Sequence, residues 1–171
     1  MKILIIRFSA IGDIAWTSPV IRCCKQQLPN AEIHFCTKAK FGVLVENNPY
    51  LDKVHYLNDS LVELLGELKS ENFDYVIDLH SKIRSKIIAF YLGKKTYTYN
   101  KLSFQRFLFT KFQINFMAGK KHVAERYLDT VKKIGVVNDY KGLDFFIAAE
   151  NELSIENFPE VYKNGYASFV I

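Results

Sequence analysis

A buried strand and the polar turn after it decide the fold: residues 2–8 read KILIIRF and residues 9–13 read SAIGD. The four consecutive aliphatic residues Ile3 to Ile6 are typical of a parallel strand that is covered on both faces. Ser18 and Pro19 then indicate a helix start, with Ser18 as the N-cap and Pro19 at the first helical position. A strand, a turn and a helix in this order form the first part of a βαβ unit.

The same alternation continues along the chain. Further strands are predicted over 31–37, 53–57, 73–79 and 95–99, and helices over 18–28, 39–46, 82–92, 104–112 and 122–134, with one more helix capped by Ser60 and carrying Leu61, Leu64, Leu65 and Leu68. Gly93 and Gly135 stand where two of these helices should end. We therefore predict an α/β fold: a Rossmann-like, mostly parallel sheet with flanking helices and right-handed crossovers.

The domain organisation follows from a change in pattern near residue 138. Residues 1–137 are predicted to form the Rossmann-like domain, and the acidic, poorly periodic residues 138–165 an interdomain connector. Residues 166–171 read as a new buried strand, which predicts the start of a C-terminal domain that this chain does not contain.

Composition narrows the class of protein. The chain has 171 residues, of which 49% are hydrophobic and 24% charged, as in globular domains. It shows no apolar run of about 20 residues and no signal-peptide pattern, so we expect a soluble cytoplasmic domain. Three cysteines predict no disulfide framework and are expected to be small buried hydrophobes. The four histidines have no ligand-like spacing, so no metal site is expected.

Charge is distributed unevenly. The net charge of +5 divides into −2 for residues 1–81, +11 for residues 82–133 and −4 for residues 134–171. Residues 82–121 contain ten basic side chains and no acidic one. A long stretch of one sign favours an anionic partner over a surface that serves only solubility. Because aromatic residues are interleaved here, single-stranded nucleic acid, phosphorylated sugars and lipid head groups all fit the pattern.

Candidate site residues lie at the carboxyl ends of the predicted strands, where open α/β sheets bind ligands. Ser9, Ala10 and Gly12 form a loop whose amides could hold a phosphate, with Gly12 allowing close backbone approach. Asp13 follows, either as a reactive carboxylate or as an ordinary turn or capping residue. Asp78 ends another strand and is better interpreted as an Asp that hydrogen-bonds a loop.

Within the basic stretch, Lys82, Arg84 and Arg106 are the candidate anion ligands. Arg84 lies two residues into the helix that follows Asp78 and is therefore close to the strand ends. A guanidinium can hold a phosphate or carboxylate through two hydrogen bonds.

Three blocks of sequence resemble glycosyltransferase family 9, the bacterial heptosyltransferases. The first is RFSAIGDI at 7–14 followed by TSPV at 17–20, the second is FDYVIDLHSKIRS at 73–85, and the third, HVAERY at 122–127, is similar to the helix that closes the family's first domain. The chain departs from the family at Ala10, which is often Ser, and at His80-Ser81, where Gln-Gly is common.

The resemblance implies a GT-B architecture of two Rossmann-like domains, of which this chain is the N-terminal, acceptor-binding one. It implies that Asp13 is the catalytic base of an inverting transfer from a nucleotide sugar such as ADP-heptose to a lipopolysaccharide-type anionic glycolipid. It further implies no cofactor beyond the co-substrate, no nucleic-acid partner, and peripheral contact with the cytoplasmic face of the inner membrane. Two other functions stay open from the residues alone: a flavodoxin-like module that binds a nucleotide or nucleic acid, and an interaction domain without chemistry.

Overall fold

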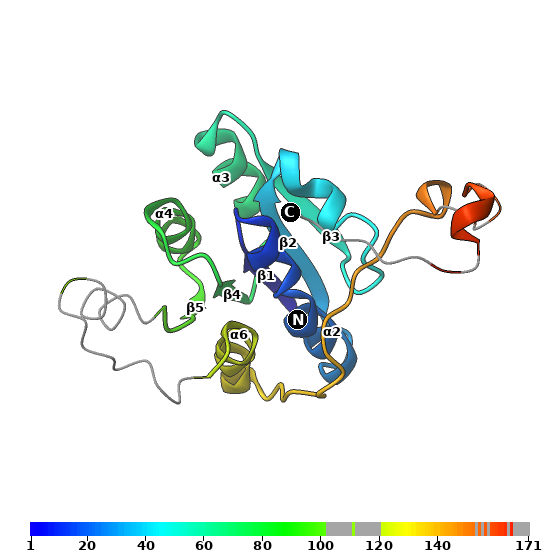
Figure 1. Ribbon diagram of the computed structural model, residues 1–171. Helices are drawn as coiled ribbons and strands as arrows, with labels where there is room; N and C mark the ends of the chain where they lie inside the picture. The colour runs from blue at the N-terminus through cyan, green and yellow to red at the C-terminus, as the bar shows by residue number, and fades with distance from the viewer. Residues whose placement is uncertain are drawn as a thin grey trace.

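Five parallel strands form the centre of the domain (Figure 1). They are β1 (Lys2–Ile6), β2 (Glu32–Lys38), β3 (Lys53–Leu57), β4 (Tyr75–Asp78) and β5 (Lys95–Thr98), in the spatial order β3-β2-β1-β4-β5. Every neighbouring pair is parallel, with Leu4 of β1 aligned with His34 of β2 and with Val76 of β4. The predicted parallel sheet is confirmed.

The computed structural model describes residues 1–101, 111, 121–152, 154, 156, 158–163 and 165. Arg106 and the strand predicted over 166–171 lie outside the described residues, as does nearly all of the helix predicted over 104–112. The described α-helices are α1 (Ile11–Ala15), α2 (Ser18–Gln27), α3 (Leu61–Ser70), α4 (Ile83–Leu92) and α6 (Val123–Val131), and the described 3₁₀ helices are η1 (Ala39–Leu44), η2 (Lys132–Ile134), η3 (Ala149–Asn151) and η5 (Glu160–Tyr162).

Strand β1 is buried on both faces because helices cover each side of the sheet. Ile3 and Ile5 pack in a core with side chains of α2 and α6, whereas Leu4 and Ile6 pack in a second core with side chains of α3 and α4. All four are fully buried. Figure 1 shows α3 and α4 on one side of the sheet and α2 and α6 on the other. The unbroken aliphatic run of β1 is thus explained by this double burial.

The three cysteines are free and buried, as predicted. Burial raises the pKa of the Cys24 thiol to about 12. The thiol therefore stays protonated near neutral pH and packs as a small apolar group.

The turn after β1 differs from the prediction in two respects. Residues 9–13 were predicted as a loop, but α1 begins at Ile11. The N-cap of α2 is Thr17 rather than Ser18, which is already the first residue of the helix. The reason is that Ser18 Oγ donates backward to the carbonyl oxygen of Ala15 at 2.9 Å and so bridges two consecutive helices instead of capping one.

The other predicted helix ends are confirmed where they depend on local hydrogen bonds or backbone angles. Ser60 Oγ accepts a hydrogen bond from the amide of Glu63 at 3.2 Å, which caps α3. Gly93 and Gly135 follow α4 and η2 with φ of 64° and 88°. Glycine adopts this left-handed conformation without strain. The helix predicted over 39–46 is the shorter 3₁₀ helix η1.

The first part of the predicted connector is held on the domain by Arg22 of α2. Its Nε and Nη2 atoms donate to the two carboxylate oxygens of Asp139 at 2.7 and 2.8 Å, and Nη1 donates to Asp144. These bonds hold the pKa of Asp139 well below its usual range. Two residues further on, the Phe146 ring meets the Tyr50 ring edge-on. Residues 139–146 therefore pack against the domain.

Candidate active site

Asp13 lies at the carboxyl end of β1, where α1 begins. Its Oδ2 atom accepts from the guanidinium of Arg7 and, at 3.4 Å, from the amide of Ala10. The contact with Ala10 shows that Asp13 also serves the start of α1, as the alternative interpretation proposed. Its Oδ1 atom makes no hydrogen bond within the described chain, and 42% of the side chain is exposed. This oxygen is therefore free to accept a proton from a bound hydroxyl.

Arg7 fixes the orientation of that carboxylate. It is buried, and its Nη1 atom donates to the carbonyl oxygen of Leu79 at 2.5 Å, just past the end of β4. The guanidinium also lies over the ring of Tyr127 from α6, 5.8 Å from its centroid. Arg7 thus joins β1, the β4–α4 loop and α6 at one point, and Asp13 is attached to that point.

Asp13 opens into a cavity of about 260 Å³ beyond the strand ends. The cavity is lined by Arg7, Ser9, Ala10, Asp13, His80, Lys82, Tyr99, Lys101, Val123 and Arg126. Of the predicted loop residues, Ser9 and Ala10 therefore line the cavity and Gly12 does not. A Cβ atom at Gly12 would meet only Trp16 Nε1, at 3.8 Å, so the packing of the chain itself does not require glycine there. The predicted role of Gly12 in close substrate approach stays a prediction.

The cavity is strongly cationic. Arg7, Lys82, Lys101 and Arg126 line it, and Asp13 is the only acidic side chain among the described residues that line it. Burial lowers the pKa of Lys101, and so do the neighbouring charges of Lys82 and Arg7. Positive charges held this close together create a local potential that attracts an anion.

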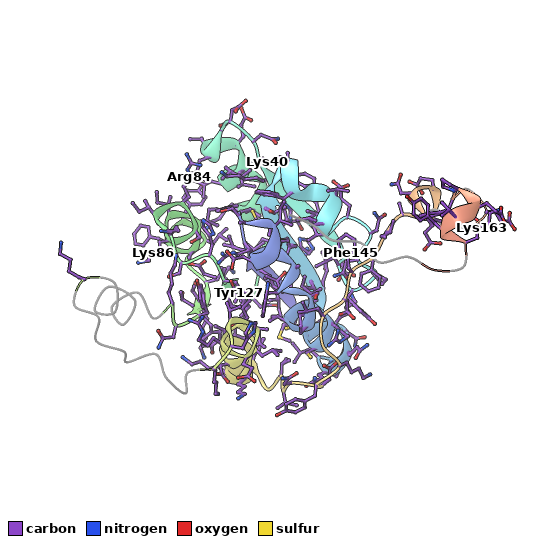
Figure 2. All side chains as sticks on the ribbon, viewed as in Figure 1. Lys40, Arg84, Lys86, Tyr127, Phe145 and Lys163 are labelled. Atoms are coloured by element: carbon purple, nitrogen blue, oxygen red, sulfur yellow. The ribbon has the colours of Figure 1, made fainter. Side chains whose placement is uncertain are left out.

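Lys82 and Arg84, which were both predicted as anion ligands, line different cavities. Lys82 lines the cavity of Asp13, whereas Arg84 lines a neighbouring one of about 590 Å³ together with Lys38, Lys40 and Asp59. Figure 2 shows Arg84 and Lys40 facing the same region between α4 and η1. None of Lys38, Lys40 and Arg84 has an ion-pair partner in the described part of the chain. We call this second space the Arg84 cavity.

Asp78 has the structural role predicted for it. It is buried, and its Oδ1 atom accepts from the amides of His80 and Ser81 at 2.9 and 2.8 Å. Its Oδ2 atom accepts from Ser85 Oγ at 3.0 Å. Asp78 therefore shapes the β4–α4 loop that carries His80 and Lys82 into the cavity.

His80 is a neutral group in this cationic cavity. Burial lowers its pKa to about 4, helped by the charges of Arg7 and Lys101. Its Nδ1 atom is buried and has no hydrogen-bond partner within the described chain. A nitrogen without a partner is less costly as an acceptor than as a donor. We therefore expect the proton on Nε2.

Acid should destabilise the domain through His80. The unfolded imidazole titrates near pH 6.5 and the folded one near 4, so the unfolded state takes up the proton first as pH falls. The stabilising contribution is complete above about pH 6.5 and is lost as pH falls toward 4, by roughly 1–2 kcal/mol after allowance for solvent screening. Urea unfolding at a series of pH values should show this loss in the parent and not in His80→Gln. Parallel pH profiles of the two proteins would contradict the assignment.

Sequence reasoning missed five cationic or polar members of the cavity: Arg7, His80, Tyr99, Lys101 and Arg126. Arg7 and His80 each lie within two residues of the carboxyl end of a strand, and that position could have marked them. Arg126 lies inside the HVAERY block and donates to the carbonyl oxygen of Asn100 at 2.8 Å. Lys101 had no distinguishing signal, because it is one of ten basic residues in its stretch.

The sheet also brings two histidines together that lie 21 positions apart. His34 Nδ1 and His55 Nε2 are 2.8 Å apart, and their other ring nitrogens contact Glu32 at 2.7 Å and Glu67 at 2.5 Å. A carboxylate of Glu71 lies within 4.8 Å of both rings but is held by two lysines. Every ring nitrogen of the two histidines has a protein partner, so they form a hydrogen-bonded chain between β2, β3 and α3.

The parallel sheet, with a cavity beyond its strand ends, assigns the chain to a structural class. The chain has the architecture of a Rossmann-like domain of the GT-B glycosyltransferases. Solved structures with this fold include the glycosyl transferase family 9 protein from Veillonella parvula DSM 2008, with 22% identity, a TM-score of 0.68, and coverage of 87% of this chain and 46% of that one. Another is the E. coli heptosyltransferase WaaC with ADP, with 19% identity, a TM-score of 0.64, and coverage of 84% and 50%.

In sequence, the chain is similar to lipopolysaccharide heptosyltransferase 1 of Campylobacter coli. The two are 31% identical over 109 residues, which cover 60% of this chain and 32% of that protein. The predicted resemblance to the heptosyltransferases of glycosyltransferase family 9 is confirmed. No protein-family model matches the chain. The chain spans about a third of the length of this relative and about half of the solved structures.

Proposed function

We propose that this chain is the acceptor-binding part of an inverting, heptosyltransferase-like glycosyltransferase. Residues 1–137 would hold the acceptor, residues 138–165 would connect, and a further domain beginning at 166–171 would hold a nucleotide sugar such as ADP-heptose. The observation that carries the proposal is the Asp13 carboxylate in a cationic cavity beyond β1, with one oxygen held by Arg7 and the other without a hydrogen bond from the described residues. The similarity to a lipopolysaccharide heptosyltransferase supports the substrate class.

The transfer is a displacement at the anomeric carbon of the donor. Asp13 Oδ1 takes the proton of an acceptor hydroxyl while the hydroxyl oxygen forms a bond to that carbon. The bond from the carbon to the diphosphate breaks on the opposite face, and the electron pair leaves with the diphosphate. Attack and departure on opposite faces invert the configuration. Arg7 keeps the carboxylate aimed at the hydroxyl, and no cofactor enters this scheme.

The two cationic cavities would hold the anionic groups of the acceptor. Lys82, Lys101 and Arg126 surround the space next to Asp13, and the Arg84 cavity offers three more cations without ion-pair partners in the described part of the chain. Phosphate and carboxylate groups on a glycolipid core match this distribution of charge. Nucleic acid would be a competitor for the same charges, but the proposal includes no nucleic-acid partner.

Within the described residues, no helix has the length and apolar character needed to cross a bilayer. We propose that the enzyme acts in the cytoplasm and meets its glycolipid at the membrane surface. Free, buried thiols fit a reducing compartment.

The direct test is transfer by the full-length protein. A glycolipid acceptor incubated with the enzyme and ADP-heptose should gain the mass of one heptose, and the product should have the inverted anomeric configuration. Binding of an oligonucleotide in place of transfer would favour the nucleic-acid alternative. No mass gain with any nucleotide sugar would contradict the proposal.

Replacing Lys82 or Arg84 should weaken acceptor binding without changing the fold. Each removes one cation from a different cavity, so Lys82→Ala and Arg84→Ala should each raise the acceptor KM by about 5- to 50-fold. Arg84→Lys should recover only part of the loss, because an ammonium cannot form the paired hydrogen bonds of a guanidinium. Steady-state kinetics with a phosphorylated acceptor measures this, and KM should rise with salt for the parent. Unchanged KM in both alanine variants would place the acceptor elsewhere.

A further inference from the structure

Helix α4 is apolar on two opposite sides, only one of which is covered by the described residues. Its inner side carries Ile88 and Leu92, which are buried against the sheet and α3. Its outer side carries four large hydrophobic residues, which we call the α4 stripe: Ile83, Ile87, Phe90 and Tyr91, exposed by 77, 42, 89 and 47%. Their spacing places them on one face of the helix. A wide apolar face of a helix is normally covered by another surface.

Positive charge surrounds this stripe. On the helical wheel, Lys86 flanks it on one side and Arg84 on the other, and Figure 2 shows these two side chains extending from different sides of α4. Residues 82–101 contain six basic side chains and no acidic one. Exposed aromatic and aliphatic side chains bordered by lysine and arginine are typical of helices that lie in the surface of an anionic membrane.

We propose that the α4 stripe is a membrane-contact surface that inserts into the headgroup region of an anionic bilayer. A second copy of the chain would place the same cations against each other, so like-charge repulsion disfavours self-association. A bilayer of anionic lipid neutralises the flanking cations while the apolar side chains leave water. The membrane-contact proposal rests on the proposed function only because a glycolipid acceptor would be located in a membrane.

The α4 stripe begins next to the Asp13 cavity. Ile83 is the first residue of α4, and the preceding residue, Lys82, lines the cavity of Asp13. A bilayer in contact with α4 would therefore lie close to the Asp13 cavity. With α4 on the bilayer, the acceptor could reach Asp13 while its lipid part stays in the membrane.

The test is co-sedimentation of the full chain with vesicles that contain neither acceptor nor donor. The parent should bind vesicles of phosphatidylcholine mixed with phosphatidylglycerol and stay in solution with phosphatidylcholine alone. The double variant Ile87→Ser, Phe90→Ser should partition at least about tenfold more weakly. Lys86→Glu should weaken partitioning about tenfold, because it replaces an attractive charge by a repulsive one.

Val43→Ser is the matched control. Val43 is 62% exposed, on η1, whose partly buried Phe41 and Leu44 pack against the core on the other side of the sheet, so its replacement should leave partitioning unchanged. A second measurement does not depend on removing the stripe: in Phe90→Trp, the emission of the new indole should shift to the blue with anionic vesicles and be quenched by brominated lipid. The signal of Trp16 in the parent is the background.

Three results would overturn the proposal: a parent that does not sediment with anionic vesicles, equal binding by the parent and the double variant, or an indole signal from Phe90→Trp that brominated lipid does not quench. A stripe variant that changes the oligomeric state of the parent would identify a second copy as the occupant. Neither vesicle binding nor indole emission depends on glycosyl transfer. A failure of the membrane-contact proposal can therefore be distinguished from a failure of the proposed reaction. If both proposals hold, the double variant keeps its rate on a soluble acceptor and loses it on an acceptor in vesicles.

Discussion

Asp13→Asn should lower the kcat of the full-length enzyme by about 10²- to 10⁴-fold, the usual contribution of general-base assistance. The amide keeps the volume of the side chain and can still accept from Arg7, but it cannot take a proton. Acceptor KM and the free energy of unfolding should therefore change little. The measurement is turnover at saturating donor and acceptor, together with urea unfolding of the same preparation.

Two other aspartates serve as controls. Asp129 is a partly exposed Asp paired with Lys121 and Lys132, so Asp129→Asn should leave kcat within a few-fold of the parent. Asp78→Asn should act mainly on stability and KM, because Asp78 holds the β4–α4 loop by three accepted hydrogen bonds. Full turnover by Asp13→Asn, with a folded but inactive Asp78→Asn, would exchange the roles of the two carboxylates.

The second large effect is on stability. Arg22→Met should lower the free energy of unfolding by about 3–5 kcal/mol, because it leaves Asp139 and Asp144 partly buried without their cation. The loss is caused by the unpaired carboxylates more than by the missing guanidinium. Combining Arg22→Met with Asp139→Asn and Asp144→Asn should therefore recover much of the stability. Urea or thermal unfolding of the three proteins measures this.

An exposed ion pair provides the comparison. Lys132 pairs with Asp129 on the surface, and about half of its side chain is in water, so Lys132→Met should cost less than about 1 kcal/mol. A loss in Arg22→Met no larger than this would show that the Arg22 pairs act as surface pairs. It would also show that residues 139–144 are only loosely attached.

The fold was predictable because its signals are local. Four aliphatic residues in succession predict a doubly covered strand, and Ser60 and Gly93 mark helix ends by their own hydrogen bonds or backbone angles. Helix α1 escaped prediction because five residues are too few to show a hydrophobic period. The shift of the α2 N-cap depended on the contact of Ser18 with Ala15, which forms only when two helices follow each other directly.

The site was predictable only in part because its contacts join distant residues. Asp13 follows from its position beyond the end of a strand, and Lys82 from the basic stretch that it begins. The partner of Asp13 does not, since Arg7 is placed by Leu79, 72 positions away, and by Tyr127. The separation of Lys82 from Arg84 has a simple cause: residues two apart near a helix start point in nearly opposite directions.

The Arg22 attachment also decides where the chain can bend. Asp139 and Asp144 are fixed to α2, and Phe146 rests on Tyr50, so residues through 146 must turn with the domain as one body. Backbone rotation that reorients whatever follows is thereby confined to residues beyond 146. If the donor-binding domain proposed above follows this segment, a few degrees of rotation beyond residue 146 would move that domain by several ångströms relative to the Asp13 cavity. Opening and closing of such an enzyme would pivot well inside the acidic segment, not where the domain's last helix ends.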